Sequence, residues 1–362
     1  MTFKQYKNGI PVIEANHAEN LEVSDSVTVE NSVTVQNSIT VEEIYTRFDV
    51  PVFLATSDYR TGSTRLAISS DGITWKEEGA LPTTSYSWLC LTYGGGKFVA
   101  LSPSTAASST DAITWTENAM PVTINSSFLQ AGWVSVVHGD GKFVATTADY
   151  TNNVGSSVAA YSTDAITWTQ TALPASRAWK SVVYGDEKFV AISTHYPLNN
   201  TAAYSTNGIT WTQTALPASV GWQSVTYGNG KFVAVASGTA IAAYSTNGIT
   251  WTQTALPSSR SAVDVTYGDG KFFAITGSTS QVSAISTDGI TWTDITLPYR
   301  TYTSVTHDRG TFVAIPGTSD RAAISTDGIT WTETTMPTTL SWHSLTSGIA
   351  NRVERINGFI YP

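Results

Sequence analysis

The segment that decides the fold is Ser-Thr-Asp-Gly-Ile-Thr-Trp at residues 286–292, because close copies of it recur along the chain. The seven copies end at Trp75, Trp115, Trp168, Trp211, Trp251, Trp292 and Trp331. Ser and Thr favour extended backbone, Asp or Asn can bond N–H groups two or three residues on, and Gly supplies a positive φ. Each copy therefore predicts a strand, a tight turn and a strand. Seven copies at about 40-residue spacing predict an all-β fold, a seven-bladed β-propeller with four-stranded blades.

One repeat unit is clearest at residues 222–257, where alternating segments are separated by turn residues. The expected strands are residues 222–227, 231–236, 242–246 and 249–254. Asn229-Gly230 is a pair that favours a two-residue hairpin turn between the first two strands. Pro257 is expected to end the ladder at an outer edge, where its missing N–H matters least.

The two ends of the repeat region are each incomplete. Residues 52–83 supply three strands, with 53–56 as the second strand and 66–75 leading into the fourth, while residues 341–346 match only a first strand. We therefore expect the N- and C-terminal strands to close one composite blade, which leaves no exposed sheet edge. The predicted organisation is an N-terminal segment 1–49, a propeller 50–346 and a C-terminal extension 347–362, which either continues the last blade or leaves it.

Residues 21–41 carry a different repeat, of six residues, with apolar pairs at Val27/Val29, Val33/Val35 and Ile39/Val41. Hexapeptide repeats favour β-helical winding, but three hexads are too few for one chain to bury these side chains. We therefore predict a short intertwined stalk, most simply a homotrimer, preceding the propeller. A hairpin or strand packed on the propeller side is the alternative.

Composition excludes several classes of function. The net charge is −9 and no basic run occurs, so the sequence predicts no nucleic-acid partner and no attraction to anionic membranes. Cys90 is the single cysteine, so no disulfide forms within the chain. The first 20 residues lack the apolar stretch of a secretory signal, and no window is long and apolar enough to insert in a membrane.

The recurrent Ser-x-Asp-Gly-x-Thr-Trp pattern resembles the Asp-box, or BNR repeat, of sialidase-type propellers, over roughly residues 50–346. That resemblance implies a structural turn remote from any active site. Asn207 and Asn247 replace the Asp, and Ala112 and Ala165 replace the Gly. Because Asn also accepts the bonds of the turn, the charge is dispensable, and we expect neither metal ligands nor catalytic groups in the repeats. No cofactor is predicted.

Ligand binding is expected on the face opposite these turns, where the loops between second and third strands differ in every unit. Arg177, Arg260 and Arg300 occupy similar positions in the loops that join one unit to the next. Their grouping is similar to the arginine triad with which sialidases hold a carboxylate, and guanidinium suits that task. The alternative is that they are solvated loop residues.

Aromatic side chains provide a second reason to expect binding there. Tyr59, Tyr150, Tyr196 and Tyr299 lie in the variable loops near asparagines, a combination that suits neutral glycans. An aromatic residue also begins the first strand of most units. These residues are Trp88, Trp133, Trp179, Trp222, Tyr302 and Trp342, with Ala262 as the exception. They either stack on sugar rings or pack between blades.

Catalysis is not expected, because a glycosidase needs two carboxyls about 5–10 Å apart and the variable loops offer only Asp58, Asp149 and Asp320. His138 and His307 stand where other units carry a Tyr and are interpreted as scaffold residues. The sequence instead looks like a phage tail fibre or receptor-binding protein, located in the virion. Residues 1–49 would attach it to other virion proteins, and the propeller would bind a host surface glycan or protein receptor. A sialidase-like hydrolase, a decoration protein and an intracellular assembly factor are the alternatives.

Overall fold

Mostly antiparallel β-sheets make up the part of the chain that the computed structural model describes, and no helix occurs in that part. The described residues are 6–7, 10–11, 27–29, 44–57, 65–82, 88–121, 131–149, 155–194, 198–277, 281–298 and 301–355. The chain divides into two compact units, one of residues Val52–Gly348 and one of Met1–Pro51 with Ile349–Pro362. None of the described segments is a helix able to span a membrane.

The strands of the larger unit pair with their neighbours in chain order and form successive sheets. The first four-stranded sheet contains β7 (Cys90–Gly94), β8 (Lys97–Leu101), β9 (Thr105–Ser109) and β10 (Thr116–Ala119). A ten-stranded sheet follows, with β11 (Ala131–Gly139), β12 (Lys142–Asp149), β13 (Ser156–Ser162), β14 (Thr169–Gly185), β15 (Lys188–Thr194), β16 (Asn199–Ser205), β17 (Thr212–Gly228), β18 (Lys231–Ser237), β19 (Thr239–Ser245) and β20 (Thr252–Arg260).

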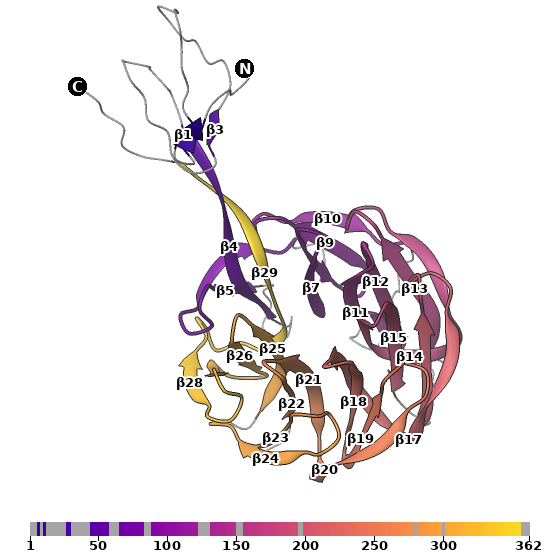
Figure 1. Ribbon diagram of the computed structural model, residues 1–362. Coiled ribbons are helices and arrows are strands. Elements are labelled where there is room, and N and C mark those ends of the chain that lie inside the picture. Colours follow the sequence, from indigo (N-terminus) through magenta and orange to yellow (C-terminus); the bar gives the residue numbers. More distant parts are fainter. Residues whose placement is uncertain are drawn as a thin grey trace, which may run out of the picture. The chain divides into compact units, whose positions relative to one another are not determined.

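Two more four-stranded sheets complete the series in chain order. They consist of β21 (Ala262–Gly268), β22 (Lys271–Thr276), β23 (Val282–Ser286) and β24 (Thr293–Thr296), then β25 (Tyr302–Asp308), β26 (Thr311–Pro316), β27 (Arg321–Ser325) and β28 (Thr332–Thr335). Figure 1 shows the sheets of this unit arranged around a common centre, with β7, β11, β21 and β25 nearest to it and β10, β20, β24 and β28 at the periphery.

The ten-stranded sheet arises because β14 and β17 each belong to two groups of four. The first half of β17 pairs with β16, and its second half pairs with β18. The expected strand 222–227 is therefore the end of a 17-residue strand, and the expected strand 249–254 begins only at Thr252. Pro257 does not end its strand, contrary to our expectation, since β20 continues to Arg260. An outer strand has one side without a ladder partner, which is where a proline is tolerated.

The hairpin turns have the predicted geometry. Between β17 and β18, Asn229 and Gly230 both have positive φ, of 45° and 69°, as a type I′ turn requires. Gly228 and Lys231 are the last paired residues on either side. The two-residue turn fixes the register of the hairpin.

The repeat turn is built from its own side chains. In the copy at 286–292, Asp288 Oδ1 accepts hydrogen bonds from the N–H groups of Ile290 (2.8 Å) and Thr291 (2.7 Å), and Gly289 N–H donates to Ser286 Oγ (2.8 Å). Asn207 makes the corresponding bonds to Ile209 and Thr210 at 2.9 Å. The prediction that an amide replaces the carboxylate without loss of the turn is confirmed.

These turns predict how acid affects stability. The backbone N–H groups of Thr167 and Ile166 lower the pKa of Asp164 to about 2, and those of Ile329 and Thr330 do the same for Asp327. Because the folded pKa lies below the unfolded value of 3.8, their stabilisation is present above pH 3.8 and is lost as the pH falls towards 2. Asp164→Asn with Asp327→Asn should flatten the loss of thermal stability over that range. An unchanged acid branch of the melting curve would contradict this.

Ala112 and Ala165 stand at the glycine position of the turn, with φ of 62° and 64°. A left-handed conformation costs a non-glycine residue about 1–2 kcal/mol, whereas losing one buried methyl group costs about 0.8 kcal/mol. Ala165→Gly should therefore raise the free energy of unfolding by up to about 1 kcal/mol, measured by urea denaturation. Gly248→Ala is the converse control, since its Cβ would lie 2.7 Å from Val190 Cγ2. Equal urea midpoints for Ala165→Gly and the parent protein would show that the backbone conformation of Ala165 is not strained.

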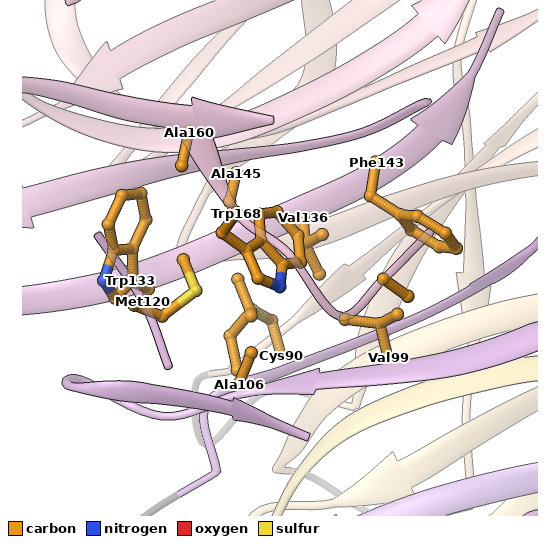
Figure 2. Packing of buried hydrophobic residues seen from close by; sticks show 12 residues of the cluster. Cys90, Val99, Ala106, Met120, Trp133, Val136, Phe143, Ala145, Ala160 and Trp168 are labelled. Atoms are coloured by element: carbon orange, nitrogen blue, oxygen red, sulfur yellow. The ribbon is translucent and has the colours of Figure 1, made fainter. Parts of the chain in front are cut away.

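The hydrophobic core lies between neighbouring sheets. Figure 2 shows one such layer, in which Trp133 and Met120 lie together and Trp168 packs near Cys90 and Val136. The aromatic residues that begin the inner strands are fully or almost fully buried, which confirms the packing interpretation over stacking on sugars. They are Trp88, Trp133, Trp179, Trp222, Trp342 and Tyr302.

Neighbouring sheets also interlock through a glycine and an aromatic ring near the end of most inner strands. A Cβ atom on Gly185 would collide with the ring of Tyr227, and Gly94 faces His138 in the same way. His138 packs on Phe143 at 4.7 Å, as Tyr184 does on Phe189. The interpretation of this histidine as a scaffold residue is confirmed.

The two incomplete ends join one sheet. Its strands are β29 (Trp342–Arg355), β4 (Ile44–Ser57), β5 (Arg65–Ser69) and β6 (Lys76–Ala80), in that order. β29 and β4 are longer than the expected 341–346 and 53–56. Residues 353–355 therefore continue the last inner strand instead of starting a new element.

In the smaller unit, β1 (Tyr6–Lys7) pairs with β2 (Ile10–Pro11), and β3 (Val27–Val29) pairs in parallel with β4 from Ile44 to Thr46. Parallel pairing means that β3 and β4 do not form a hairpin. The rest of the hexad segment and residues 356–362 lie outside the described residues.

Candidate functional site

One residue breaks the pairing register in five of the inner strands. In β14, Trp179 pairs with Ser193 and Ser181 pairs with Ile192, so Lys180 is an extra residue between them. The same shift occurs around Val134, Gln223, Val263 and Thr303. A β-bulge of this kind redirects a side chain and is common beside functional sites.

We call the seven residues at this position the rim. They are Leu89, Val134, Lys180, Gln223, Val263, Thr303 and His343, and water reaches part of each one. The residue before each is buried in the core, so the rim is the first accessible layer of the inner strands. The rim side chains are varied, with valine occurring twice, whereas the aromatic before and the serine after them mostly repeat.

Contacts place the rim on the face with variable loops. Gln223 Nε2 donates to Thr194 Oγ1 (3.5 Å), at the end of β15 where a variable loop begins. A Cβ atom on Gly277, which follows β22, would lie 2.6 Å from Val263 Cγ1, and one on Gly317, which follows β26, would lie 2.9 Å from Thr303 Cγ2. The rim and the strand ends from which the variable loops leave therefore share one face of the fold.

Behind the rim, a second layer of hydroxyl groups bridges neighbouring inner strands. Ser135 Oγ accepts the N–H of Val182 (3.1 Å), and Ser181 Oγ accepts the N–H of Val225 (3.3 Å). Ser344 Oγ accepts the N–H of Leu91 (3.0 Å), which joins the C-terminal inner strand to β7. Backbone groups that face the centre are thereby paired outside the ladders.

Asp264 replaces serine in this layer and is saturated with hydrogen bonds. Its Oδ1 accepts from Ser224 Oγ (2.8 Å) and Val265 N–H (2.9 Å), and its Oδ2 accepts from Val305 N–H (3.0 Å) and Ser304 Oγ (3.1 Å). Burial raises the pKa of Asp264 although these bonds oppose the rise. The carboxylate is thus a structural acceptor that connects β17, β21 and β25.

Lys180 and Cys90 complete the polar groups at the centre. Burial lowers the pKa of Lys180, while the negative charge of Asp264, and that of Cys90 when it is ionised, act in the opposite direction. Burial raises the pKa of the Cys90 thiol to about 12, so this thiol is protonated and unreactive at neutral pH. Among the described residues, no group of three or more His, Cys, Asp or Glu side chains could hold a metal ion.

The arginines expected to hold a carboxylate are separately bonded. Arg260 is 7% exposed and pairs through Nη2 with Asp294 Oδ1 (2.5 Å) and Ser258 Oγ (2.7 Å). Arg177 Nε donates to Thr201 Oγ1 (3.2 Å). These contacts favour a structural role for Arg260. Arg177 and Arg260 bond to different partners. Arg300, Tyr59, Tyr150, Tyr196 and Tyr299 lie outside the described residues.

The sequence interpretation did not single out the rim. Its signal was present, because a position with six residue types in seven copies stands between two positions that mostly repeat. The bulge itself depends on the pairing register, which the sequence does not display. The candidate site is therefore the rim together with the surrounding variable loops.

No protein-family model matches the chain, and no curated protein does. Among solved structures it is similar to a streptogramin B lyase, with a TM-score of 0.61 and 13% identity over 76% of this chain and 96% of that one. The fold is that of a β-propeller. Virginiamycin B lyase from Staphylococcus aureus is similar at a TM-score of 0.58 and 13% identity, covering 75% of this chain and 96% of that one.

YCF48 bound to D1 peptide is also similar, with a TM-score of 0.51 and 14% identity over 75% of this chain and 92% of that one. These propellers include enzymes and a peptide-bound protein. At such identities the likeness extends to the fold alone, so function has to be argued from the site.

Proposed function

We propose that this chain is a non-enzymatic virion protein, of the phage tail-fibre or receptor-binding kind, whose propeller binds a host surface glycan or receptor through its variable face. The observation that carries the binding proposal is the rim. A bulge at one position of five inner strands presents a varied set of side chains, Val134, Lys180, Gln223, Val263 and Thr303, on the face from which the variable loops leave. A rigid scaffold with one repetitive face and one varied face suits recognition.

The scaffold in this proposal is a seven-bladed, Asp-box type ring, closed by the N- and C-terminal strands. Contacts across the two ends support closure. Thr334 Oγ1 donates to Ile73 O (2.5 Å). Thr171 Oγ1 makes the equivalent bond to Ile209 O between two repeats of the ten-stranded sheet. Gly348 faces the ring of Tyr93, as Gly185 faces Tyr227.

The virion assignment and the homotrimer rest on the hexad segment and on the resemblance to tail fibres. Residues 1–49 would attach the protein to other virion proteins. Mass measurement of the full chain in solution should give three copies per particle. A monomer would remove the trimeric stalk from the proposal.

Catalysis is not part of the proposal, although the similar lyases are enzymes. Asp264 directly follows the rim residue Val263 in the sequence. The four hydrogen bonds that its carboxylate accepts all come from protein donors. A general acid or base needs a position from which it reaches the substrate. A carboxylate held by four protein donors is suited to a structural role.

A glycan array tests binding, with Val134→Arg on the rim compared with Ile329→Arg on the repeat turn, where Ile329 is 56% exposed. Both variants replace an aliphatic residue by arginine, and thermal melting establishes that both fold. We expect the parent protein and Ile329→Arg to bind the same glycans and Val134→Arg to lose them. Silence of the parent protein would favour a decoration protein or an assembly factor, and turnover of a polysaccharide would favour a hydrolase.

A further inference from the structure

Asn-Gly pairs are prone to spontaneous loss of the asparagine amide, because glycine has no side chain to keep its backbone nitrogen away from the asparagine carbonyl. Five such pairs occur in the chain, and Asn8-Gly9 and Asn357-Gly358 lie outside the described residues. The other three are Asn207-Gly208, Asn229-Gly230 and Asn247-Gly248. They occupy two kinds of turn, a repeat turn and a hairpin turn, and the structure restrains the two kinds differently.

The asparagines of the repeat turns are restrained at both groups that would have to react. Asn207 Oδ1 accepts two backbone N–H groups at 2.9 Å and the hydroxyl of Ser205 at 3.0 Å. The attacking nitrogen would be that of Gly208, which is buried and donates its N–H to Ser205 Oγ (2.9 Å). Asn247 has the same set of bonds in its own turn. The side chain and the nitrogen can react there only when the turn opens.

Asn229 lies in the hairpin turn, where these restraints are missing. Asn229 and Gly230 are both exposed, and the ladder ends before them with the pair of Gly228 and Lys231. Within the described part of the chain, no hydrogen bond engages the side chain of Asn229 or the N–H of Gly230. A Cβ atom added to Gly230 would meet nothing within 4 Å apart from its chain neighbours, so space surrounds the attacking nitrogen. The Asn229 side chain can therefore turn towards that nitrogen without breaking a ladder bond.

We propose that Asn229 is a site of spontaneous modification, at which the folded chain converts this asparagine to aspartate. The nitrogen of Gly230 loses its proton and attacks Cγ of Asn229, so that a C–N bond forms, ammonia leaves and a cyclic imide remains. Water then opens the ring at Cγ, which restores the backbone and leaves a side-chain carboxylate. Opening at the other carbonyl gives isoaspartate, which lengthens the backbone of the turn. The net reaction consumes water and releases ammonia, and it changes no oxidation state.

Equivalent hairpin turns of the same chain already carry the product. Asp140 and Asp186 occupy the position of Asn229, with φ of 46° and 45° against 45° for Asn229. Each of these aspartates pairs with the lysine two residues further on, at 2.8 Å and 2.9 Å. Lys231 is the corresponding lysine after Asn229. A carboxylate at position 229 therefore fits the same turn and gains the same kind of partner, while the turn acquires one negative charge.

Tandem mass spectrometry of the full chain, incubated in mildly alkaline buffer and then digested, tests the site. Conversion at Asn229 should be about tenfold or more faster than at Asn207 or Asn247, because each of those must first lose several hydrogen bonds. In concentrated urea the three asparagines should convert at similar rates, since the turns no longer restrain them. Equal or slower conversion at Asn229 in the folded protein, or the same advantage of Asn229 in urea, would overturn the proposal.

Ser205→Ala tests the restraint directly, because it removes the acceptor of the Gly208 N–H and a donor to Asn207. Conversion at Asn207 should rise in this variant, while Asn247, whose own serine is intact, should not change and is the internal control. Thermal melting establishes that the variant folds, and an unchanged rate at Asn207 in the folded variant would contradict the restraint. Asn229→Asp should melt no lower than the parent protein. A lower melting temperature would show that the turn does not accommodate the product.

Discussion

Asp264→Ala should lower the free energy of unfolding by about 3 kcal/mol, because it removes the acceptor of four hydrogen bonds, although Val265 N–H keeps a second acceptor in Ser224 Oγ (3.4 Å). Each unsatisfied buried donor costs about 1–3 kcal/mol, and partial access of water at the centre reduces the sum. Urea denaturation measures the change. The site connects three inner strands, so the loss should affect the whole cooperative transition and not one local segment.

Asp264→Ser is the control that the chain itself supplies, since serine occupies this position in most other inner strands. A serine hydroxyl accepts the N–H of the next strand at Ser135 and Ser181, so we expect a loss of about 1 kcal/mol or less. If alanine and serine were equally tolerated, the hydrogen bonds of the carboxylate would not stabilise the ring.

The pH dependence of the same group has the opposite sign to that of the repeat turns. The folded pKa of Asp264 is raised above 3.8 by burial, so its contribution is most favourable below pH 3.8 and is lost as the pH rises through the folded pKa. Asp264→Ser should remove this component and leave the acid loss from Asp164 and Asp327 in place.

Trp342→Ala should cost about 3–5 kcal/mol, the range for removing a large buried aromatic side chain. Trp342 is fully buried and packs in one cluster with Phe53 and Trp75 near the start of the unit and with Val313 of the neighbouring sheet. Its indole N–H also donates to Thr338 O (3.3 Å). The substitution therefore tests whether the C-terminal strand is part of the core.

Ile349→Ala on the same strand is the comparison, because Ile349 is 37% exposed and its truncation should change stability by less than about 0.5 kcal/mol. Thermal or urea unfolding of the two variants gives the difference. Similar midpoints for Trp342→Ala and Ile349→Ala would mean that the C-terminal strand does not complete the unit.

Local chemistry explains why the repeat turns and the hairpins were predictable from the sequence. The bonds of Asp288 reach only two and three residues along the chain, and Asn229-Gly230 determines its own turn. The composite sheet was predictable because two incomplete fragments complement each other. Strand lengths were less predictable, because the continuation of β20 past Pro257 depends on which side of the strand lacks a ladder partner.

The rim and the central polar groups could not be predicted in the same way. The partners of Asp264 lie 40 and 41 residues away, so their proximity follows from the arrangement of the sheets and not from a local pattern. Arg260 looked like a binding residue because loop arginines often are, and its pairing with Asp294 is visible only in the fold. Lys180 was overlooked because it stands between two strongly recurrent residues, Trp179 and Ser181.

The central proposal is that one face of a ring closed from seven blades is scaffold and that the other face, around the rim, binds the ligand. An experimental density map of the full chain, soaked with the glycan that binds best on the array, tests it most directly. We expect seven blades with the C-terminal strand beside β4, and ligand density within hydrogen-bonding distance of rim residues such as Lys180 and Gln223. Six or eight blades, or ligand density at the repeat turns, would contradict the proposal.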